Sequence, residues 1–567
     1  MARILVIQLG RLGDVIQTTP LLRELVHDNH SGSVDVLVFD SLREIVEGIG
    51  LRRIHSFSER ALPLTLRQLD KTIEENRKQL GAVPREAHEA LQNLALPAYD
   101  HIVNCSYSPL GAFVAQNARH KSIAGPVITF AGEILFHHPA QIYLCARASF
   151  RNQNWFNLVD LWRASGRPYQ NKVPAFIARP HVPIASEVPF DIPSGRIVAL
   201  NPGSSDAARR WPPGEFASLA EGLVSHGLVP ALVGAPSDRE TCAEVQSRST
   251  VPIANFCGKT SVPQLAFFLT HADLLVSNDT GAIHIAAAAG CRSLSLFGST
   301  AYFAETAPWA TGHVILQGPL GSDLIVLHPK LVLASALYCL ELIGEDILRT
   351  ETARQDASAW ETFFLDPQAD PLGGISYRPL HGDHFSSDQI FARELRHLFA
   401  HVFSNAGNFP GVGDCSHLAG EFGNRRIVTP VNERDLGVAC AVAGLESMAE
   451  AAARCGALCA RQTRESAAEI TSLSASLVGA MEELTTHAEI HTRMKPVIHF
   501  LDWTCRMMDP MDPVPTFHAH QHAYNLAARM LSECEFRAQA KLEGADRFSR
   551  LSNQKVWDVQ SPVDVPI

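Results

Sequence analysis

The segment Ser277–His284 carries residue types that are suited to binding an anion. It links an apolar run that predicts a buried strand to a run that predicts a helix, and the first N–H groups of a helix have no partner within it. Gly281 lets the backbone approach a phosphate closely, Thr280 adds a hydroxyl, and His284 lies one turn further on. We expect Asp279 to orient this loop or a neighbouring group. The alternative is an ordinary helix start, capped by Asp279 or Thr280, that binds no ligand.

Two other segments carry groups that a nucleoside diphosphate requires. The small-residue loop Asn201–Ser205 follows a predicted strand and leads to Arg209 and Arg210, so we expect Ser204 and both arginines to contact a diphosphate. A solvated basic turn is the alternative. Asp238 follows the next predicted strand, where Rossmann-like folds often place an acidic residue on the ribose hydroxyls. We expect these segments to meet Thr280 at the carboxyl edge of one parallel sheet.

The N-terminal segment places a carboxylate on a glycine loop. Gly10, Arg11, Gly13 and Asp14 form a G-x-x-G-D pattern, which differs from the G-x-G-x-x-G dinucleotide fingerprint and argues against NAD binding. A carboxylate that faces a cleft between two domains can act as a general base. The alternative is that Asp14 only caps the following helix.

Taken together, these motifs resemble the ADP-heptose:lipopolysaccharide heptosyltransferases of glycosyltransferase family 9 over residues ~1–347. The matching segments are Gly10–Asp14 with Thr19–Leu22, Asn201–Gly203 with Arg209–Pro212, and Asn278–Gly281 with His284. The resemblance implies an α/β protein with a GT-B fold, in which two Rossmann-like domains face a cleft. It also implies an inverting, metal-independent transfer of a sugar, heptose from ADP-heptose, to a lipopolysaccharide core or another surface glycan.

The resemblance also assigns roles to individual residues. Asp14 corresponds to the base that takes a proton from the acceptor, and Gly10, Arg11 and Gly13 to the acceptor-side loop. Arg209 falls where the family often has a lysine. The implied diphosphate ligands are Arg209, Arg210, Ser204, Thr280, Gly281 and His284, with Asp279 as a loop-orienting residue and Asp238 at the ribose.

The predicted elements divide the chain into four parts. Residues 1–180 form the first Rossmann-like, acceptor-binding domain, with a helical insertion at 60–96, and residues 190–347 form the second, nucleotide-sugar-binding domain. Residues 350–390 are expected to be a connection without regular structure, and residues 391–567 an α-helical domain of unassigned role. Thr19 and Pro20 predict the start of a helix at Leu21–His27, and Lys330–Ile347 predicts a closing helix.

The composition of the chain argues against a nucleic-acid partner, a membrane span and a metal ion. The net charge of −11 argues against a nucleic-acid partner, and no apolar run reaches the ~18 residues of a membrane span. The chain has no Asp-x-Asp, a common device for holding a metal–diphosphate, which is consistent with a metal-free mechanism. We also expect no cofactor. Several His pairs in the C-terminal region have spacings that zinc could use, but chance pairs are expected among 25 histidines.

The sequence is compatible with more than one function. We expect a cytoplasmic protein that can lie on the inner face of the cytoplasmic membrane, where lipid-anchored acceptors are found, and a helical domain able to bind a protein partner. One alternative is the same fold acting on another nucleotide sugar. Another is a non-catalytic glycan- or nucleotide-binding protein whose helical domain is an interaction module.

Overall fold

A computed structural model gives the fold of residues 2–29, 33–58, 94–128, 134–147, 151, 154–166, 176–321, 324, 327–354, 361–367 and 373–380, with short helical stretches between 396 and 531. Most of the predicted insertion at 60–96 lies outside these residues. So do two of the His pairs with a spacing that zinc could use, His397 with His401 and His487 with His491. The chain forms two compact units, residues 1–383 with 400–409, and residues 384–399 with 410–567.

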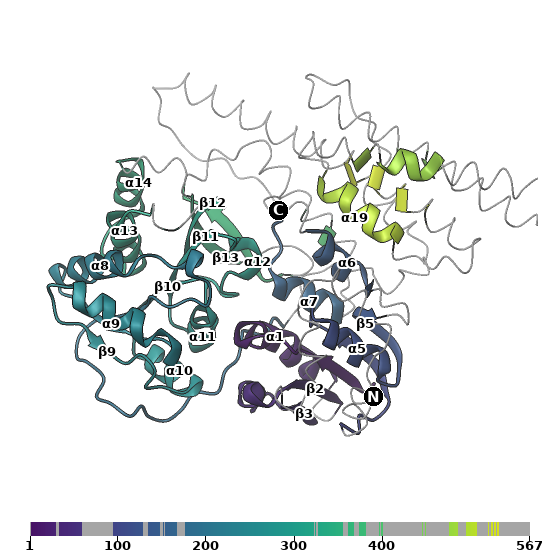
Figure 1. Ribbon diagram of the computed structural model, residues 1–567, viewed down its shortest axis with the longest axis horizontal. Helices are drawn as coiled ribbons and strands as arrows, with labels where there is room; N and C mark the ends of the chain where they lie inside the picture. The colour runs from purple at the N-terminus through teal and green to yellow at the C-terminus, as the bar shows by residue number, and fades with distance from the viewer. Residues whose placement is uncertain are drawn as a thin grey trace, which may run out of the picture. The chain divides into compact units, whose positions relative to one another are not determined.

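The first sheet has the strand order β3-β2-β1-β4-β5-β6, which is the doubly wound order with its reversal between β1 and β4. All neighbouring strands are parallel except β5 and β6. Helices α1 and α7 pack together, as do α6 and α7, while α5 packs on β5 (Figure 1). The elements are β1 (Ile4–Ile7), α1 (Leu12–Asn29), β2 (Val34–Phe39), β3 (Arg53–Phe57), β4 (Tyr99–Asn104), α5 (Pro109–Asn117), β5 (His120–Ile128), β6 (Ile134–His137), α6 (Pro139–Ala146) and α7 (Leu158–Gly166).

Helix α1 begins earlier than predicted. The sequence predicted a helix at Leu21–His27 opened by Thr19 and Pro20, but α1 is continuous and contains Pro20. A proline cannot donate to the carbonyl four residues before it. Here the carbonyl of Ile16 instead accepts a hydrogen bond from Thr19 Oγ1 at 2.6 Å, so the carbonyl keeps a partner and the helix passes through Pro20.

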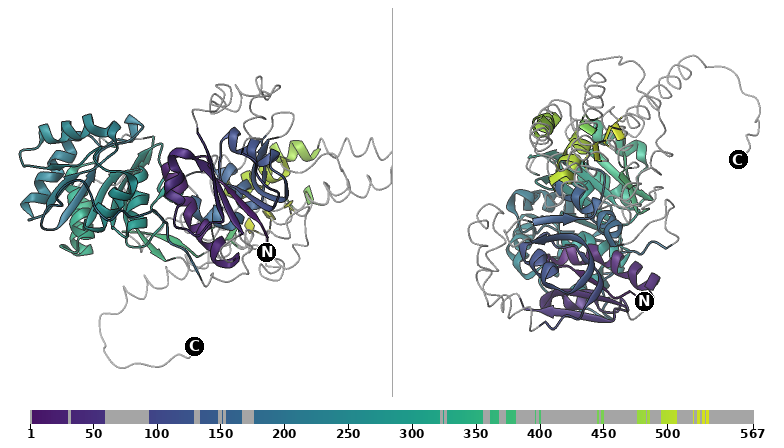
Figure 2. Two further views of the ribbon diagram at one scale, coloured as in Figure 1. Left: turned by 90° about the horizontal axis from the view of Figure 1, so that it is seen from below. Right: turned by 90° about the vertical axis from the view of Figure 1, so that its right-hand side faces the viewer.

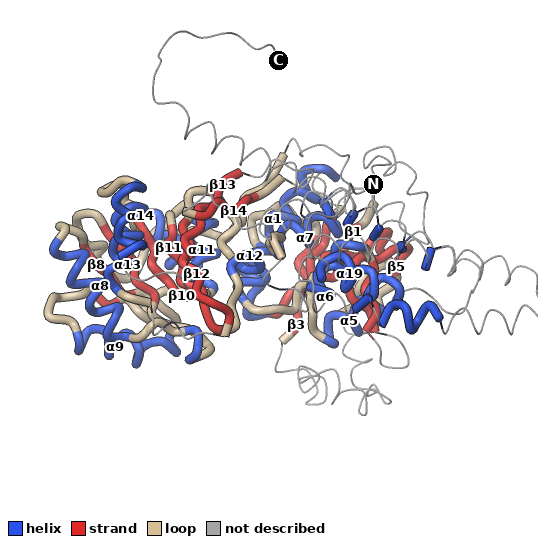
Figure 3. The backbone as a smooth tube through the Cα atoms, turned by 90° about the horizontal axis from the view of Figure 1, so that it is seen from above, coloured by secondary structure: helices blue, strands red, loops and turns tan. Residues whose placement is uncertain are grey.

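The second sheet repeats the same order as β9-β8-β7-β10-β11-β12 and then adds β13 and β14. Helix α8 packs with both α9 and α13, and α10 packs with α11. Figures 2 and 3 show strands of this sheet lying between helices. The elements are β7 (Ile197–Asn201), α8 (Pro213–Ser225), β8 (Val229–Leu232), α9 (Arg239–Arg248), β9 (Ala254–Asn255), α10 (Val262–Thr270), β10 (Leu274–Asn278), α11 (Gly281–Ala289), β11 (Ser293–Ser299), α12 (Phe303–Thr306), β12 (Val314–Leu320), α13 (Pro329–Cys339), α14 (Glu345–Arg354), β13 (Glu361–Pro367) and β14 (Ile375–Pro379).

The closing helix predicted at Lys330–Ile347 is two helices, α13 and α14. Glu341 adopts the left-handed conformation, with φ of 60°, and the N–H of Leu342 bonds to the carbonyl of Leu337 at 2.9 Å. This is the geometry of a Schellman helix end, in which glycine is the usual left-handed residue. The break could not be predicted from sequence because a glutamate occupies the position where glycine is usual.

Strands β13 and β14 lie where the sequence predicted an irregular connection at 350–390. Strand β13 pairs antiparallel with β12, and β14 pairs antiparallel with β13. Phe363, Phe364 and Leu365 are buried in this extension of the sheet. This apolar run is short, flanked by polar residues and without alternation of apolar and polar positions, so the sequence pattern did not indicate a strand.

These observations confirm the predicted α/β fold of two Rossmann-like parts. In the second unit, the described residues with regular structure are helical, in keeping with the predicted helical region. Helix α19 (Lys495–Arg506) buries Val497, Ile498 and Leu501 along one side. Among the described residues, no helix combines the length and the apolar character needed to cross a membrane.

Candidate functional site

The candidate site lies where the order of the second sheet reverses, between β7 and β10. The two strands are parallel neighbours, and Ser277 pairs in register with Asn201, so the loops that follow them leave the sheet at the same edge. Ligands of open α/β sheets bind in the crevice at this switch point. The structure therefore brings together the two loops that the sequence indicated separately.

Thr280 forms the start of helix α11. Its Oγ1 accepts a hydrogen bond from the N–H of Ala282 at 3.3 Å, so Thr280 is the N-cap that the sequence left undecided between positions 279 and 280. Asn201 Nδ2 donates to the same hydroxyl at 3.0 Å and joins the two loops. The N–H groups and positive dipole end of α11 point out of this sheet edge, which gives the geometry of an anion site.

Asn278 holds the two loops together. Its Nδ2 donates to the carbonyls of Pro202 at 3.0 Å and Gly203 at 3.2 Å, and its Oδ1 accepts from the backbone N–H of Trp211 at 3.1 Å. The side chain is fully buried. Sequence reasoning noted Asn278 only as part of a motif; a buried asparagine at the end of an apolar strand was the signal that could have identified this role.

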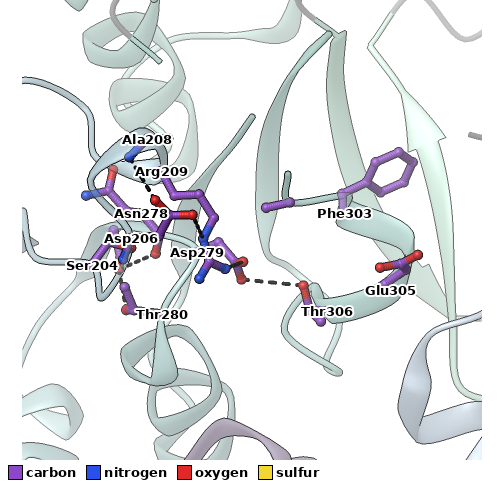
Figure 4. Close-up of polar contacts among 12 residues, drawn as sticks. Ser204, Asp206, Ala208, Arg209, Asn278, Asp279, Thr280, Phe303, Glu305 and Thr306 are labelled. Carbon is purple, nitrogen blue, oxygen red and sulfur yellow. Dashed lines mark hydrogen bonds and ion pairs between the residues drawn. The ribbon is translucent and has the colours of Figure 1, made fainter. Parts of the chain in front are cut away.

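Arg209 and Asp279 form an ion pair in this edge. Arg209 Nη1 donates to Asp279 Oδ2 at 3.1 Å, while Thr306 Oγ1 donates to Asp279 Oδ1 at 3.4 Å. Figure 4 shows Arg209 and Thr306 on opposite sides of Asp279. Burial raises the pKa of the Asp279 carboxyl, against the opposing charge and hydrogen bond of Arg209. Asp279 thus contacts the guanidinium of Arg209, and its expected role in orienting a neighbouring group stays a prediction.

Arg210 and Ser204 brace the loop that follows β7. Arg210 Nε donates to the carbonyl of Ser204 at 2.8 Å, and Ser204 Oγ accepts from the N–H of Asp206 at 3.3 Å. Both predicted ligands therefore lie at the expected edge. These contacts fix the shape of the loop.

Asp238 lies against the same loop through a close approach to Gly203. Its Oδ2 accepts from the N–H of Ala235 at 2.8 Å. A Cβ at Gly203 would be 2.3 Å from Asp238 Cγ, so only glycine fits beneath this carboxylate. The predicted ribose residue is therefore at the same sheet edge as Arg209 and Thr280.

The first sheet contributes the start of α1. Asp14 Oδ2 accepts from the N–H of Arg11 at 2.9 Å, which is the cap that the sequence offered as an alternative role. A Cβ at Gly10 would be 2.7 Å from this oxygen, so glycine leaves space for the carboxylate. Burial raises the pKa of Asp14, although the N–H and charge of Arg11 act against that rise.

The starts of α1 and α11 meet (Figure 1). A Cβ at Gly13 would be 3.1 Å from His284 Cδ2, and one at Gly281 would be 3.3 Å from Leu12 Cδ2. Glycine at both positions allows the two helix starts to approach. Burial lowers the pKa of His284 to about 3, with His313 contributing, so the imidazole is neutral at physiological pH.

Three polar atoms around these loops are buried without a hydrogen-bond partner. They are Asn201 Oδ1, Arg209 Nε and Gln17 Oε1. Buried polar groups are normally satisfied, and exceptions concentrate where a ligand or water completes the bonding. Within the described part of the chain, no group of three or more His, Cys, Asp or Glu side chains is arranged to hold a metal ion.

Comparison with known proteins identifies the segment that contains these loops. Residues 164–322 match the family model of glycosyltransferase family 9 (heptosyltransferase). The resemblance to this family is confirmed. The matched segment includes Ser204, Arg209, Asp238 and the whole of Asn278–His284, whereas Gly10–Asp14 lies outside it.

Individual relatives match shorter stretches of the chain. Lipooligosaccharide heptosyltransferase 2 of Campylobacter jejuni serotype O:2 is 32% identical over 120 residues, which are 20% of this chain and 37% of the relative. The corresponding protein of Haemophilus influenzae is 32% identical over 109 residues, 18% of this chain and 32% of the relative. The match thus spans about a third of each relative.

Among solved structures, a glycosyl transferase family 9 protein from Veillonella parvula covers 60% of this chain and 98% of its own, with 17% identity and a TM-score of 0.46. The ADP-heptose lps heptosyltransferase II of E. coli covers 60% of this chain and 99% of its own, with 18% identity and a TM-score of 0.41.

Proposed function

We propose that the protein is a glycosyltransferase that moves heptose from ADP-heptose to a lipopolysaccharide core or a related surface glycan, with inversion and without a metal ion. One observation carries the proposal. The starts of α1 and α11 meet through Gly13 and His284, so the half-buried carboxylate of Asp14 at the start of one helix lies beside the proposed anion-binding edge at the start of the other.

The second sheet binds the donor in this proposal. The diphosphate lies at the N-terminus of α11, where backbone N–H groups and Thr280 donate to it and Arg209 and Arg210 supply positive charge. Ser204 adds a hydroxyl, and the Asp238 carboxylate accepts hydrogen bonds from the ribose. Because these charges belong to the chain itself, the diphosphate does not need a metal ion for neutralisation, which agrees with the lack of Asp-x-Asp.

The first sheet binds the acceptor. The Asp14 carboxylate takes the proton from the acceptor hydroxyl as that oxygen attacks the anomeric carbon from the face opposite the diphosphate, so the configuration inverts. Its raised pKa favours this proton transfer, since a base works best with a pKa closer to the working pH. The departing diphosphate gains negative charge, which the arginines and the α11 N-terminus stabilise.

His284 acts as a neutral group in this mechanism. Its imidazole carries a single N–H, and its packing against Gly13 places it between the two helix starts. It can donate one hydrogen bond to the donor without competing with Arg209 as a cation. Because acceptors of this class are lipid-anchored on the inner face of the cytoplasmic membrane, we propose that the protein works in the cytoplasm in contact with that face. The C-terminal helical region is available for a protein partner.

A single substitution tests the assigned chemistry. Asp14→Asn keeps an acceptor oxygen for the Arg11 N–H but removes the base, so we expect heptose transfer to fall by about 10²–10⁴-fold. The affinity for ADP should remain that of the wild type. Transfer at the wild-type rate would refute Asp14 as the base, and no transfer by the wild type with any nucleotide sugar would favour a binding protein.

A further inference from the structure

The short helix α12 contacts both the part of unit 1 that is built on the first sheet, here called the acceptor half, and the sheet edge around Arg209 and Thr280. We call that edge, which is assigned above to the donor, the donor edge. Helix α12 carries Glu305, which is only 5% exposed. Arg151, from the segment after α6, donates to both carboxylate oxygens, with Nε–Oε1 at 2.9 Å and Nη2–Oε2 at 2.6 Å. Arg147 Nε lies 3.4 Å from Oε1. The guanidinium groups of Arg147 and Arg151 in the acceptor half thus contact the carboxylate of Glu305 on α12.

The next residue in α12 reaches the donor edge. Thr306 Oγ1 donates to Asp279 Oδ1 at 3.4 Å, and Asp279 Oδ2 accepts from Arg209 at 3.1 Å. Figure 4 shows Glu305 and Thr306 side by side on α12, with Thr306 toward Asp279. An unbroken path of contacts therefore leads from Arg151 to the guanidinium that we assign to the diphosphate.

Helix α12 needs outside contacts to hold its position. It has four residues and no side-chain N-cap, and so short a helix is not stable by itself. Phe303 stacks on Phe363 at 4.1 Å between ring centroids, and Asn157 Nδ2 donates to the carbonyl of Ala307 at 3.0 Å. Glu305 adds the only contact of these three in which charge is involved, and it lies one residue from Thr306.

We propose that Glu305 is a positioning residue for the donor diphosphate. Its ion pair with Arg151 fixes α12 so that Thr306 holds Asp279, and Asp279 in turn directs Arg209 toward the phosphates. The inference rests on the proposed function, because it takes Arg209 as a diphosphate ligand. It adds that residues of the acceptor half set the geometry of the donor site without touching the donor.

A purely structural role for Glu305 makes different predictions. A pair that only joins the two halves would affect the thermal stability of the chain and leave nucleotide affinity unchanged. The control is the ion pair of Arg163 with Glu24, at 2.8 Å, which does not include a residue of α12. Both of its side chains are fully buried, whereas the Arg151 side chain is 35% exposed. Glu24→Gln therefore removes a more deeply buried Arg–Glu pair away from the proposed path.

The test is calorimetric titration of ADP into the full chain. We expect Glu305→Gln to weaken ADP binding about tenfold, within the range typical of coupled sites, and Thr306→Val to weaken it by a similar factor. The double variant should be no weaker than Thr306→Val, because both changes interrupt one path. Thr306→Ser keeps the hydroxyl and should bind ADP as the wild type does. Glu24→Gln should lower the unfolding temperature but not the affinity.

Several outcomes would overturn the inference. These are an ADP affinity of Glu305→Gln within twofold of the wild type, additive effects in the double variant, or an equal loss of affinity in Glu24→Gln. If Glu305→Gln does not fold, two other variants replace it. Thr306→Val changes no charge and tests the role of the hydroxyl. Arg151→Lys keeps the charge but removes the bidentate geometry of the ion pair. If the wild type binds no nucleoside diphosphate, the proposed function fails and the inference falls with it.

Discussion

Gly203 allows a sharp test of the donor edge, because one methyl group there would displace a single carboxylate. The Cβ of an alanine at this position would lie 2.3 Å from Asp238 Cγ and 2.5 Å from each carboxylate oxygen. Non-bonded carbon atoms rest at about 3.5–4.0 Å, so Asp238 would have to move by more than about 1 Å. That movement breaks the 2.8 Å hydrogen bond from the N–H of Ala235.

The size of the effect follows from these contacts. Forcing a methyl group into a filled space costs about 1–3 kcal/mol of folding free energy. If the Asp238 carboxylate binds the ribose, its displacement also loses a hydrogen bond to a charged group, worth about 1.5–3 kcal/mol. We therefore expect Gly203→Ala to weaken ADP binding about 10- to 150-fold.

Calorimetric titration of ADP, with thermal unfolding measured in parallel, separates the two effects. Asp238→Ala should lose the same affinity without the clash, and Gly203→Ala/Asp238→Ala should bind no more weakly than either single variant while regaining stability. Gly344→Ala is the matched control, because nothing lies within 4 Å of a Cβ there. Wild-type affinity in Asp238→Ala would refute the ribose assignment, and wild-type affinity in Gly203→Ala would show that the carboxylate does not need its present position.

Three further predictions follow from the site. Burial raises the folded-state pKa of Asp14, so ionisation of this carboxyl opposes folding, and its contribution to stability falls as the pH rises from 3.8 through the raised pKa. Urea titration at pH 7 should therefore show that Asp14→Asn is more stable than the wild type, and a less stable variant would contradict this. Asn278→Ala loses contacts to Pro202, Gly203 and Trp211 and should lower the free energy of unfolding by about 2–4 kcal/mol in the same assay; an unchanged value would show that these bonds do not secure the loops. Arg209→Lys should weaken ADP binding less than Arg209→Met, because lysine keeps the charge but loses the planar geometry; equal losses would mean that charge is not what Arg209 contributes.

The donor edge could be predicted from sequence because its signals are local. At Asn278 a parallel strand, a short loop and a helix start follow one another within a few residues. At Asn201 a parallel strand is followed by a loop of small residues and the two arginines before α8 begins at Pro213. The carboxyl ends of neighbouring parallel strands meet, so the two loops had to converge once the strands were assigned. The residue types then indicated an anion site, and the structure places Thr280 and Arg209 at that edge.

Features that depend on distant contacts could not be predicted in the same way. Thr306 is 27 residues from Asp279, and Glu305 is 154 residues from Arg151, so no spacing in the sequence links them. Helix α1 passes through Pro20 because Thr19 replaces the missing bond, an effect that propensity alone does not contain. The roles of individual site residues likewise remain predictions, because position at the sheet edge does not show what binds there.

The most direct test of the central claim is calorimetric titration of ADP, GDP and UDP into the full chain, with and without a divalent metal. We predict binding of ADP in preference to GDP and UDP, equal in strength without metal, and lost when Arg209 and Thr280 are both changed to alanine. Binding that survives the double substitution would contradict the site, and preference for GDP or UDP would contradict the donor. Binding of none of the three would contradict the assignment of this edge to a nucleotide sugar.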